Sequence, residues 1–317
     1  MASNNQGSDG TRERTVQQGR LHTGGGLVAA GSASWLVRSI LMVVGFVALV
    51  WGLLSVFSLS VERVATGLTV ALLAFTGATV ALLLGSFLLG TGLLVHQSGT
   101  AALAWTDGIG QRFAPTDATR RKAVAAGVLL LVHGTLALLG ISAMLSLMAA
   151  GTSIDPGTIR RLTEMAFAAW IIDAVVLAVA SGLVASYLLS LRRDLAFSEP
   201  LGATGFVVYA IMDAVGVFLF VLVFSVQFRQ AGGVLLVAGL LELLVVPIVG
   251  IAAFALLVWT GVRMRRLAPG PYPQPRPLVP VYPYLTYPGW TPVLAYPAPA
   301  PAPSDPEVPP PPPEPAA

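Results

Sequence analysis

The sequence predicts an all-α fold: a polytopic membrane protein with a bundle of six transmembrane helices between two disordered tails. Two observations lead to this prediction. The chain has 317 residues, of which 55% are hydrophobic and only 10% are charged, whereas soluble domains carry roughly 25% charged residues. The apolar residues also gather into six runs that are each long enough to cross a bilayer, which takes about 20 helical residues. Such segments must be helical, because a helix satisfies its own backbone hydrogen bonds in lipid.

The six apolar runs divide the chain into a leading tail, a membrane domain and a second tail. The predicted spans are Trp35–Ser58, Ala65–His96, Ala123–Ala149, Ala166–Leu191, Ala203–Phe228 and Val234–Val262. Residues 1–34 are polar and then glycine-rich, which predicts a disordered cytoplasmic lead-in. The transmembrane domain is therefore expected to cover residues 35–266.

Residues 267–317 form a tail of a different composition, with 20 of the 24 prolines and four Tyr-Pro pairs. Proline lacks the amide hydrogen and fixes φ, so we expect a disordered segment with polyproline II stretches. The spacing Pro277-x-x-Pro280-x-x-Pro283 weakly matches ligands of polyproline-binding modules. Two interpretations follow: the tail recruits a cytoplasmic polyproline-binding protein, or it is a solvated spacer or a self-associating segment.

Arginine and lysine residues predict the orientation of the bundle. With an inner N-terminus, 14 of the 18 basic residues fall on the inner side of the membrane and 4 on the outer side. Basic residues accumulate on the cytoplasmic side of membrane proteins, so both termini are expected in the cytoplasm. If the source is bacterial, the membrane is the cell membrane. Trp35, Trp170 and Trp259 lie near predicted span ends, where tryptophan commonly anchors a helix at the interface.

Composition also excludes several functional classes. The chain has no cysteine, so it has no disulfide, thiolate zinc site or iron–sulfur cluster. Its three histidines lie far apart in sequence, and a net charge of +3 indicates no nucleic-acid-binding surface. No hydrolase, zinc-protease or phosphate-binding motif occurs. We therefore expect no enzyme, no metal site, no cofactor and no nucleic-acid partner.

The candidate functional residues are ionisable groups inside the apolar runs: Asp173, Asp213, Glu242 and His133. A charged group near the bilayer centre costs at least ~2.5–3.5 kcal/mol, so such residues usually face a bundle interior. Counted from the midpoints of the runs, Asp173 and Glu242 are expected roughly 7–9 Å to the outer side of the centre. Asp213 and His133 are expected roughly 3–5 Å to the inner side. No arginine or lysine is expected at that depth.

Two interpretations of these four residues remain open. They could form a proton or cation pathway, in which Pro247 frees a backbone carbonyl beside Glu242. Alternatively, they are neutral groups that hold helices together by hydrogen bonds. The sequence around Asp173, Ile171–Val175, also resembles that around Asp213, Ile211–Val215.

Small residues at spacings of four mark faces for close helix packing. One set is Gly77, Ala81 and Gly85, and a second set is Ala174, Ala178, Gly182 and Ser186. These faces allow packing within the chain or between copies of it in a homo-oligomer. Taken together, the sequence predicts a multi-pass protein in contact with the lipid bilayer. It leaves two functions open: a small transporter or ion pathway, and a non-catalytic scaffold with a recruiting tail.

Overall fold

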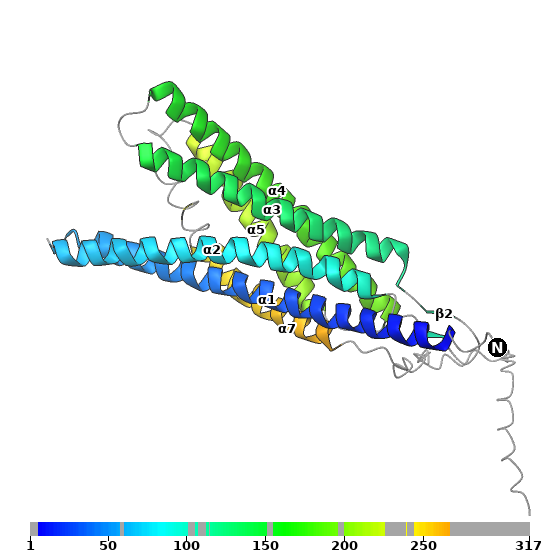
Figure 1. Ribbon diagram of the computed structural model, residues 1–317. Helices are drawn as coiled ribbons and strands as arrows, with labels where there is room; N and C mark the ends of the chain where they lie inside the picture. Colours follow the sequence, from blue (N-terminus) through cyan, green and yellow to red (C-terminus); the bar gives the residue numbers. More distant parts are fainter. Residues whose placement is uncertain are drawn as a thin grey trace, which may run out of the picture. The chain divides into compact units, whose positions relative to one another are not determined.

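A computed structural model of the chain describes residues 6–57, 60–100, 105–106, 112–113, 115–150, 155–195, 200–225, 239 and 244–266. Its helices are α1 (Gln6–Leu54), α2 (Val61–Gly99), α3 (Asp117–Ala150), α4 (Pro156–Leu195), α5 (Pro200–Ser225) and α7 (Val246–Arg265) (Figure 1). All six contain segments long and apolar enough to cross a membrane. The predicted all-α architecture of a multi-pass membrane protein is confirmed.

The six helices close into a ring of neighbours. Helix α1 packs on α2, α2 on α3, α3 on α4, α4 on α5, α5 on α7, and α7 again on α1. Consecutive helices along the chain run in opposite directions, and α1 and α2 lie side by side over most of their lengths (Figure 1). A ring of helices has an interior, and that interior is where polar side chains can avoid lipid.

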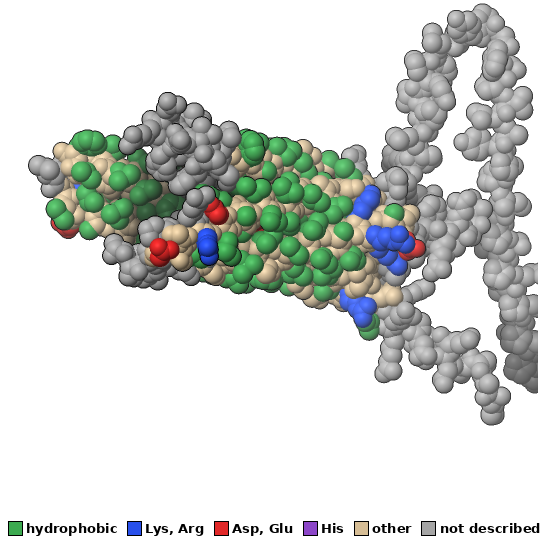
Figure 2. All heavy atoms as spheres, turned by 90° about the horizontal axis from the view of Figure 1, so that it is seen from above, with side chains coloured by type: hydrophobic (Ala, Val, Ile, Leu, Met, Phe, Trp, Pro, Cys, Tyr) green, Lys and Arg blue, Asp and Glu red, His purple; other side chains and the backbone are tan. Residues whose placement is uncertain are grey.

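The surface of the bundle suits a bilayer. Apolar side chains cover most of the face shown in Figure 2, and charged side chains gather mainly at one end and in a smaller group toward the other. Many large apolar side chains are exposed along the helices, for example Leu72, Val80, Val179 and Phe218. Exposed apolar area of this extent is rare on soluble monomers, and hydrocarbon chains of lipid would cover it.

Helix α1 differs from the prediction at its N-terminal part. We expected disorder up to residue 34, but the helix begins at Gln6 and the side chains of Leu21 and Val28 are fully buried or nearly so. The glycine-rich stretch explains the difference, because it lies against neighbouring helices instead of forming a flexible linker. Residues 1–5 and the proline-rich tail at 267–317 lie outside the described residues.

Glycines bring α1 and α2 into backbone contact. A Cβ atom added to Gly24 would lie 2.4 Å from the backbone nitrogen of His96, and one added to Gly31 would lie 2.6 Å from that of Leu89. Gly92 of α2 meets the backbone nitrogen of Val28 in the same way, at 2.7 Å. Small residues allow this close approach. The resulting van der Waals contact stabilises the helix pair in lipid, where no hydrophobic effect drives helices together.

Two further segments add detail to the predicted architecture. Helix α7 begins at Val246, directly after a π-helical turn at residues 244–245, and Pro247 lies in the first turn of α7. Residues Trp105–Thr106 (β1) and Arg112–Phe113 (β2) form a short antiparallel pair in the loop between α2 and α3. Neither segment changes the architecture of the bundle.

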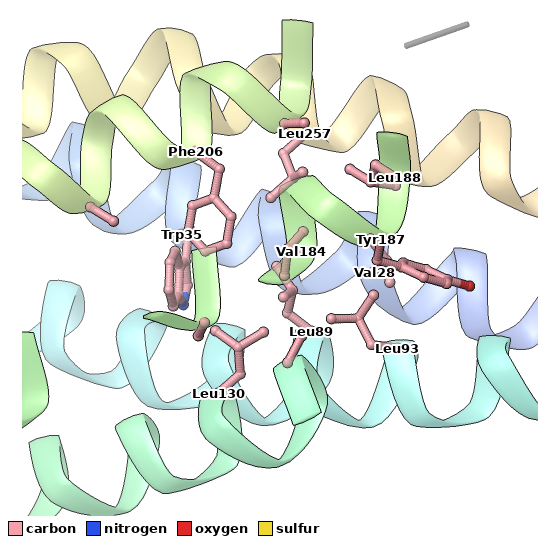
Figure 3. Packing of buried hydrophobic residues seen from close by; sticks show 14 of the residues in the cluster. Val28, Trp35, Leu89, Leu93, Leu130, Val184, Tyr187, Leu188, Phe206 and Leu257 are labelled. Atoms are coloured by element: carbon pink, nitrogen blue, oxygen red, sulfur yellow. The ribbon is translucent and has the colours of Figure 1, made fainter. Parts of the chain in front are cut away.

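An aromatic cluster fills the bundle interior around Trp35, whose side chain is fully buried. Its ring centroid lies 5.0 Å from that of Phe254, 5.5 Å from that of Phe206 and 6.3 Å from that of Tyr209. Figure 3 shows Trp35 and Phe206 next to one another. The indole nitrogen donates to the Leu82 carbonyl oxygen at 3.2 Å. The interpretation of Trp35 as an interfacial anchor is therefore wrong, because this side chain belongs to the core.

Candidate intramembrane polar site

A cavity of about 390 Å³ lies in the interior of the bundle. Five helices contribute to its walls, and most of the lining is apolar. Its polar and aromatic lining residues are Trp35, Arg38, Thr79, His133, Trp170, Asp173, Tyr209 and Asp213. Three of the four candidate residues predicted from the sequence therefore line one cavity. The fourth, Glu242, lies outside the described residues.

His133 of α3 and Asp173 of α4 form a direct pair. The His133 Nδ1 and Asp173 Oδ1 atoms are 2.7 Å apart, which is the distance of a strong hydrogen bond. The two side chains are 4% and 15% exposed, so the pair is largely shielded from the surroundings. When His133 carries two protons the pair is an ion pair, and when it carries one the contact is a hydrogen bond.

This pairing corrects the predicted depths of the two residues. We expected them on opposite sides of the bilayer centre, yet they touch. Helices α3 and α4 extend beyond the apolar runs at their ends, so the midpoints of the runs are not the midpoints of the helices. His133 and Asp173 each lie close to the middle of the helix that the structure shows.

Arg38 and Tyr209 connect α1 and α5 to the same cavity. The Arg38 Nη1 group donates a hydrogen bond to the Tyr209 hydroxyl group. That hydroxyl lies 3.4 Å from Asp213 Oδ1, one helical turn along α5, at the long limit of a hydrogen bond. The prediction that no basic residue reaches this depth is therefore wrong. Arg38 is the only arginine or lysine inside the six predicted spans. A basic residue within an apolar run was the sequence signal that could have identified Arg38 as part of the polar site.

The ionisable groups of the cavity act on one another. Asp213 experiences the charges of Arg38, His133 and Asp173 together. Coulomb interactions between groups in a low-dielectric interior are much stronger than in water. A change in the protonation of one group will therefore change the free energy of ionising the others. The two aspartates come from α4 and α5, which pack against one another, and from the two similar five-residue segments of the sequence.

Glycines position two of the aromatic walls. A Cβ atom on Gly85 of α2 would lie 2.0 Å from Cδ1 of Trp35, so only glycine leaves room for the indole. A Cβ atom on Gly140 of α3 would lie 2.8 Å from Nε1 of Trp170. The Trp35 ring also contacts His133 edge-on, with centroids 5.6 Å apart. Small residues on α2 and α3 thus create the space that aromatic rings from α1 and α4 fill.

A second buried polar pair lies elsewhere in the bundle, and sequence reasoning did not find it. His96 Nδ1 of α2 lies 2.7 Å from the Tyr187 hydroxyl group of α4, and both side chains are fully buried. Neither residue lines the cavity that contains Asp173 and Asp213. Within the described ranges, no group of three or more histidine, aspartate or glutamate residues is arranged to hold a metal ion.

Comparison with known proteins gives no assignment: no protein-family model, curated protein or solved structure matches this chain.

Proposed function

We propose that the protein is a small membrane transporter that moves protons through the bundle interior by way of His133, Asp173 and Asp213. The observation that carries this proposal is the 2.7 Å pair of His133 and Asp173 in a cavity that also contains Asp213 and Arg38. Groups that serve only as packing contacts need no cavity beside them. A cavity gives an ion or substrate room to reach the groups that exchange the proton.

A proton fits the site better than a metal cation. A metal cation needs several ligand atoms at short distance, and among the described residues no group of three or more histidine, aspartate or glutamate residues is arranged to hold one. The proton, in contrast, needs only a donor and an acceptor at hydrogen-bond distance, and His133 and Asp173 provide both.

In the proposed mechanism, the imidazole of His133 takes up a proton, and the Asp173 carboxylate stabilises the resulting imidazolium. Loss of that proton leaves Asp173 without a cationic partner and changes the field at Asp213. The Tyr209 hydroxyl group accepts from Arg38 and donates toward Asp213, so it keeps the second carboxylate oriented. Each cycle takes a proton from one side of the membrane and releases it on the other.

We also propose that both termini lie in the cytoplasm and that the chain is no enzyme. The support for the orientation is the distribution of basic residues, 14 on one side and 4 on the other. The support for the second statement is the lack of any catalytic motif in the sequence.

Proton flux into liposomes tests the proposed function. The purified protein is reconstituted into vesicles with an internal pH-sensitive dye, and a pH gradient is applied. We expect flux above that of empty vesicles for the wild type and at least about a tenfold loss for Asp173→Asn, which keeps the shape but cannot accept the proton.

Asp155→Asn is the matched control. Asp155 is exposed, and its carboxylate accepts from the Thr158 backbone N–H at 3.2 Å at the start of α4. Asparagine caps a helix equally well, so this variant should carry wild-type flux. Equal flux in wild-type, Asp173→Asn and empty vesicles, with the protein folded, would contradict the proposal.

The alternative is a non-catalytic scaffold whose proline-rich tail recruits a cytoplasmic partner. The observation in its favour is the concentration of 20 of 24 prolines in residues 267–317. A chain that ends at Arg266 separates the two functions, because a transporter keeps its flux after the truncation, whereas a scaffold loses its only recruiting segment.

A further inference from the structure

We infer that the cavity binds an organic cation with apolar substituents, such as a hydrophobic amine or a quaternary onium ion. This inference rests on the proposed transport function and adds the class of substrate. The cavity volume of about 390 Å³ falls in the usual range for sites that take small organic molecules, roughly 300–1,000 Å³. A bare proton pathway needs far less space.

The walls of the cavity suit the apolar part of such a ligand. Aromatic side chains of Trp35, Trp170 and Tyr209 stand beside aliphatic ones such as Met42 and Leu177. Transfer of apolar groups from water to such walls is favourable, at roughly 25 cal/mol per Å². Tryptophan and tyrosine rings also attract organic cations, because the ring face is negative. Inorganic ions have no apolar surface to bury against these walls.

The charges of the lining favour a cation over an anion. Asp173 and Asp213 supply two carboxylates, and Arg38 supplies one permanent positive charge. While both aspartates are ionised and His133 is neutral, the described lining therefore has one excess negative charge. An anion would face both carboxylates beside the single guanidinium group, which already donates to Tyr209 and acts electrostatically on Asp213.

Binding of the cation and of the proton are expected to exclude one another. The partner of Asp173 is the His133 imidazole, and that partner is positive only when it carries a second proton. An organic cation beside Asp173 supplies the same positive charge, so it favours release of one proton from His133. The charge in the cavity is then unchanged, since one cation enters and one proton leaves. Such competition is the basis of an exchange of substrate for protons across the membrane.

Two ions of the same shape and opposite charge test the sign of the ligand. Tetraphenylphosphonium is a cation and tetraphenylborate an anion, and both are apolar. Their saturable binding to the purified full-length protein is measured by calorimetry in detergent, with protein-free micelles as the blank. We expect saturable binding of tetraphenylphosphonium only, and weaker binding as the pH is lowered, since protons compete.

Asp173→Asn should weaken tetraphenylphosphonium binding by about tenfold or more, whereas the control Asp155→Asn should leave it unchanged. Saturable binding of tetraphenylborate alone, or no saturable binding of either ion to the folded wild type, would overturn the inference. Equal binding to wild type and to folded Asp173→Asn would overturn it as well. If tetraphenylphosphonium does not bind while proton flux is intact, only this inference fails. If flux is also absent, the proposed function fails with it.

Discussion

Arg38 is a basic residue inside an apolar span, and its guanidinium group extends to the Tyr209 hydroxyl group in the interior of the bundle. An unpaired charge at this depth would cost at least ~2.5–3.5 kcal/mol. The aspartates of the cavity offset that cost, and the arginine in turn offsets part of the cost of a buried charge on Asp213. The polar site is therefore a set of mutually dependent charges.

Removal of the Tyr209 hydroxyl group should lower proton flux by more than its small effect on stability explains. We expect Tyr209→Phe to keep the ring contact with Phe254, whose centroid is 4.6 Å away, and to lose the link between Arg38 and Asp213. The loss in stability should be about 1 kcal/mol, as for one buried hydrogen bond. Proton flux should fall several-fold, because the second carboxylate loses its orienting partner.

Tyr187→Phe is the control for this change, since it removes the hydroxyl group that pairs with His96 away from the cavity. Both variants should lower the melting temperature in detergent by similar amounts. Only Tyr209→Phe should lower the flux in liposomes. A similar flux loss in both variants would mean that general destabilisation, and not the cavity, limits transport.

At the scale of single residues, the sequence predicts the acids better than their partners. Asp173, Asp213 and His133 stand out because ionisable groups are rare in apolar runs. Arg38 and Tyr209 are 171 residues apart in sequence, and their link depends on how the two helices that carry them are rotated. A long arginine side chain also reaches several residues beyond its own Cα position, so counting along a helix misplaces its charge.

At the scale of elements, the close packing of α1 and α2 depends on individual glycines. We expect Gly24→Ala to destabilise the protein, because its Cβ would lie 2.4 Å from the backbone nitrogen of His96 and the two helices must separate. Gly26→Ala, two residues along the same helix, meets nothing within 4 Å in the described part of the chain. Alanine is the better helix former by about 1 kcal/mol, so this control should be neutral or stabilising.

Thermal melting in detergent checks the pair of variants. The expected result is a lower melting temperature for Gly24→Ala and an equal or higher one for Gly26→Ala. If both variants melt like the wild type, the approach of α1 and α2 at this point is less close than the structure shows.

The number and order of the helices were predictable, and their ends were not. Apolar runs of more than 20 residues identify a transmembrane helix without any knowledge of its neighbours. The extension of α1 back to Gln6 depends on contacts of Leu21 and Gly25 with other helices, which no local pattern in a polar, glycine-rich segment shows. The extended ends of α3 and α4 likewise shift Asp173 and His133 to a common depth.

At the scale of the whole molecule, the orientation of the bundle can be tested on a cysteine-free background. Single cysteines are introduced at Ala118, at the start of α3, and at Phe57, between α1 and α2; both positions are exposed. With cytoplasmic termini, a membrane-impermeant maleimide should label Phe57→Cys in intact cells, and it should label Ala118→Cys only after the cells are opened. The reverse pattern would mean that the bundle is inverted.

The central claim is that the interior of the bundle holds an exchangeable proton between His133 and Asp173. Infrared spectroscopy of the protein in membranes tests it most directly, because the carboxylate vibration of Asp173 depends on whether its hydrogen-bond partner is an imidazole or an imidazolium. We expect the carboxylate signal of the wild type to change as the pH is stepped over roughly pH 3 to 9, a range that brackets ordinary carboxyl and imidazole groups. Part of that change should be missing in Asp173→Asn and present in Asp155→Asn. An identical pH response in the wild type and Asp173→Asn would contradict the account.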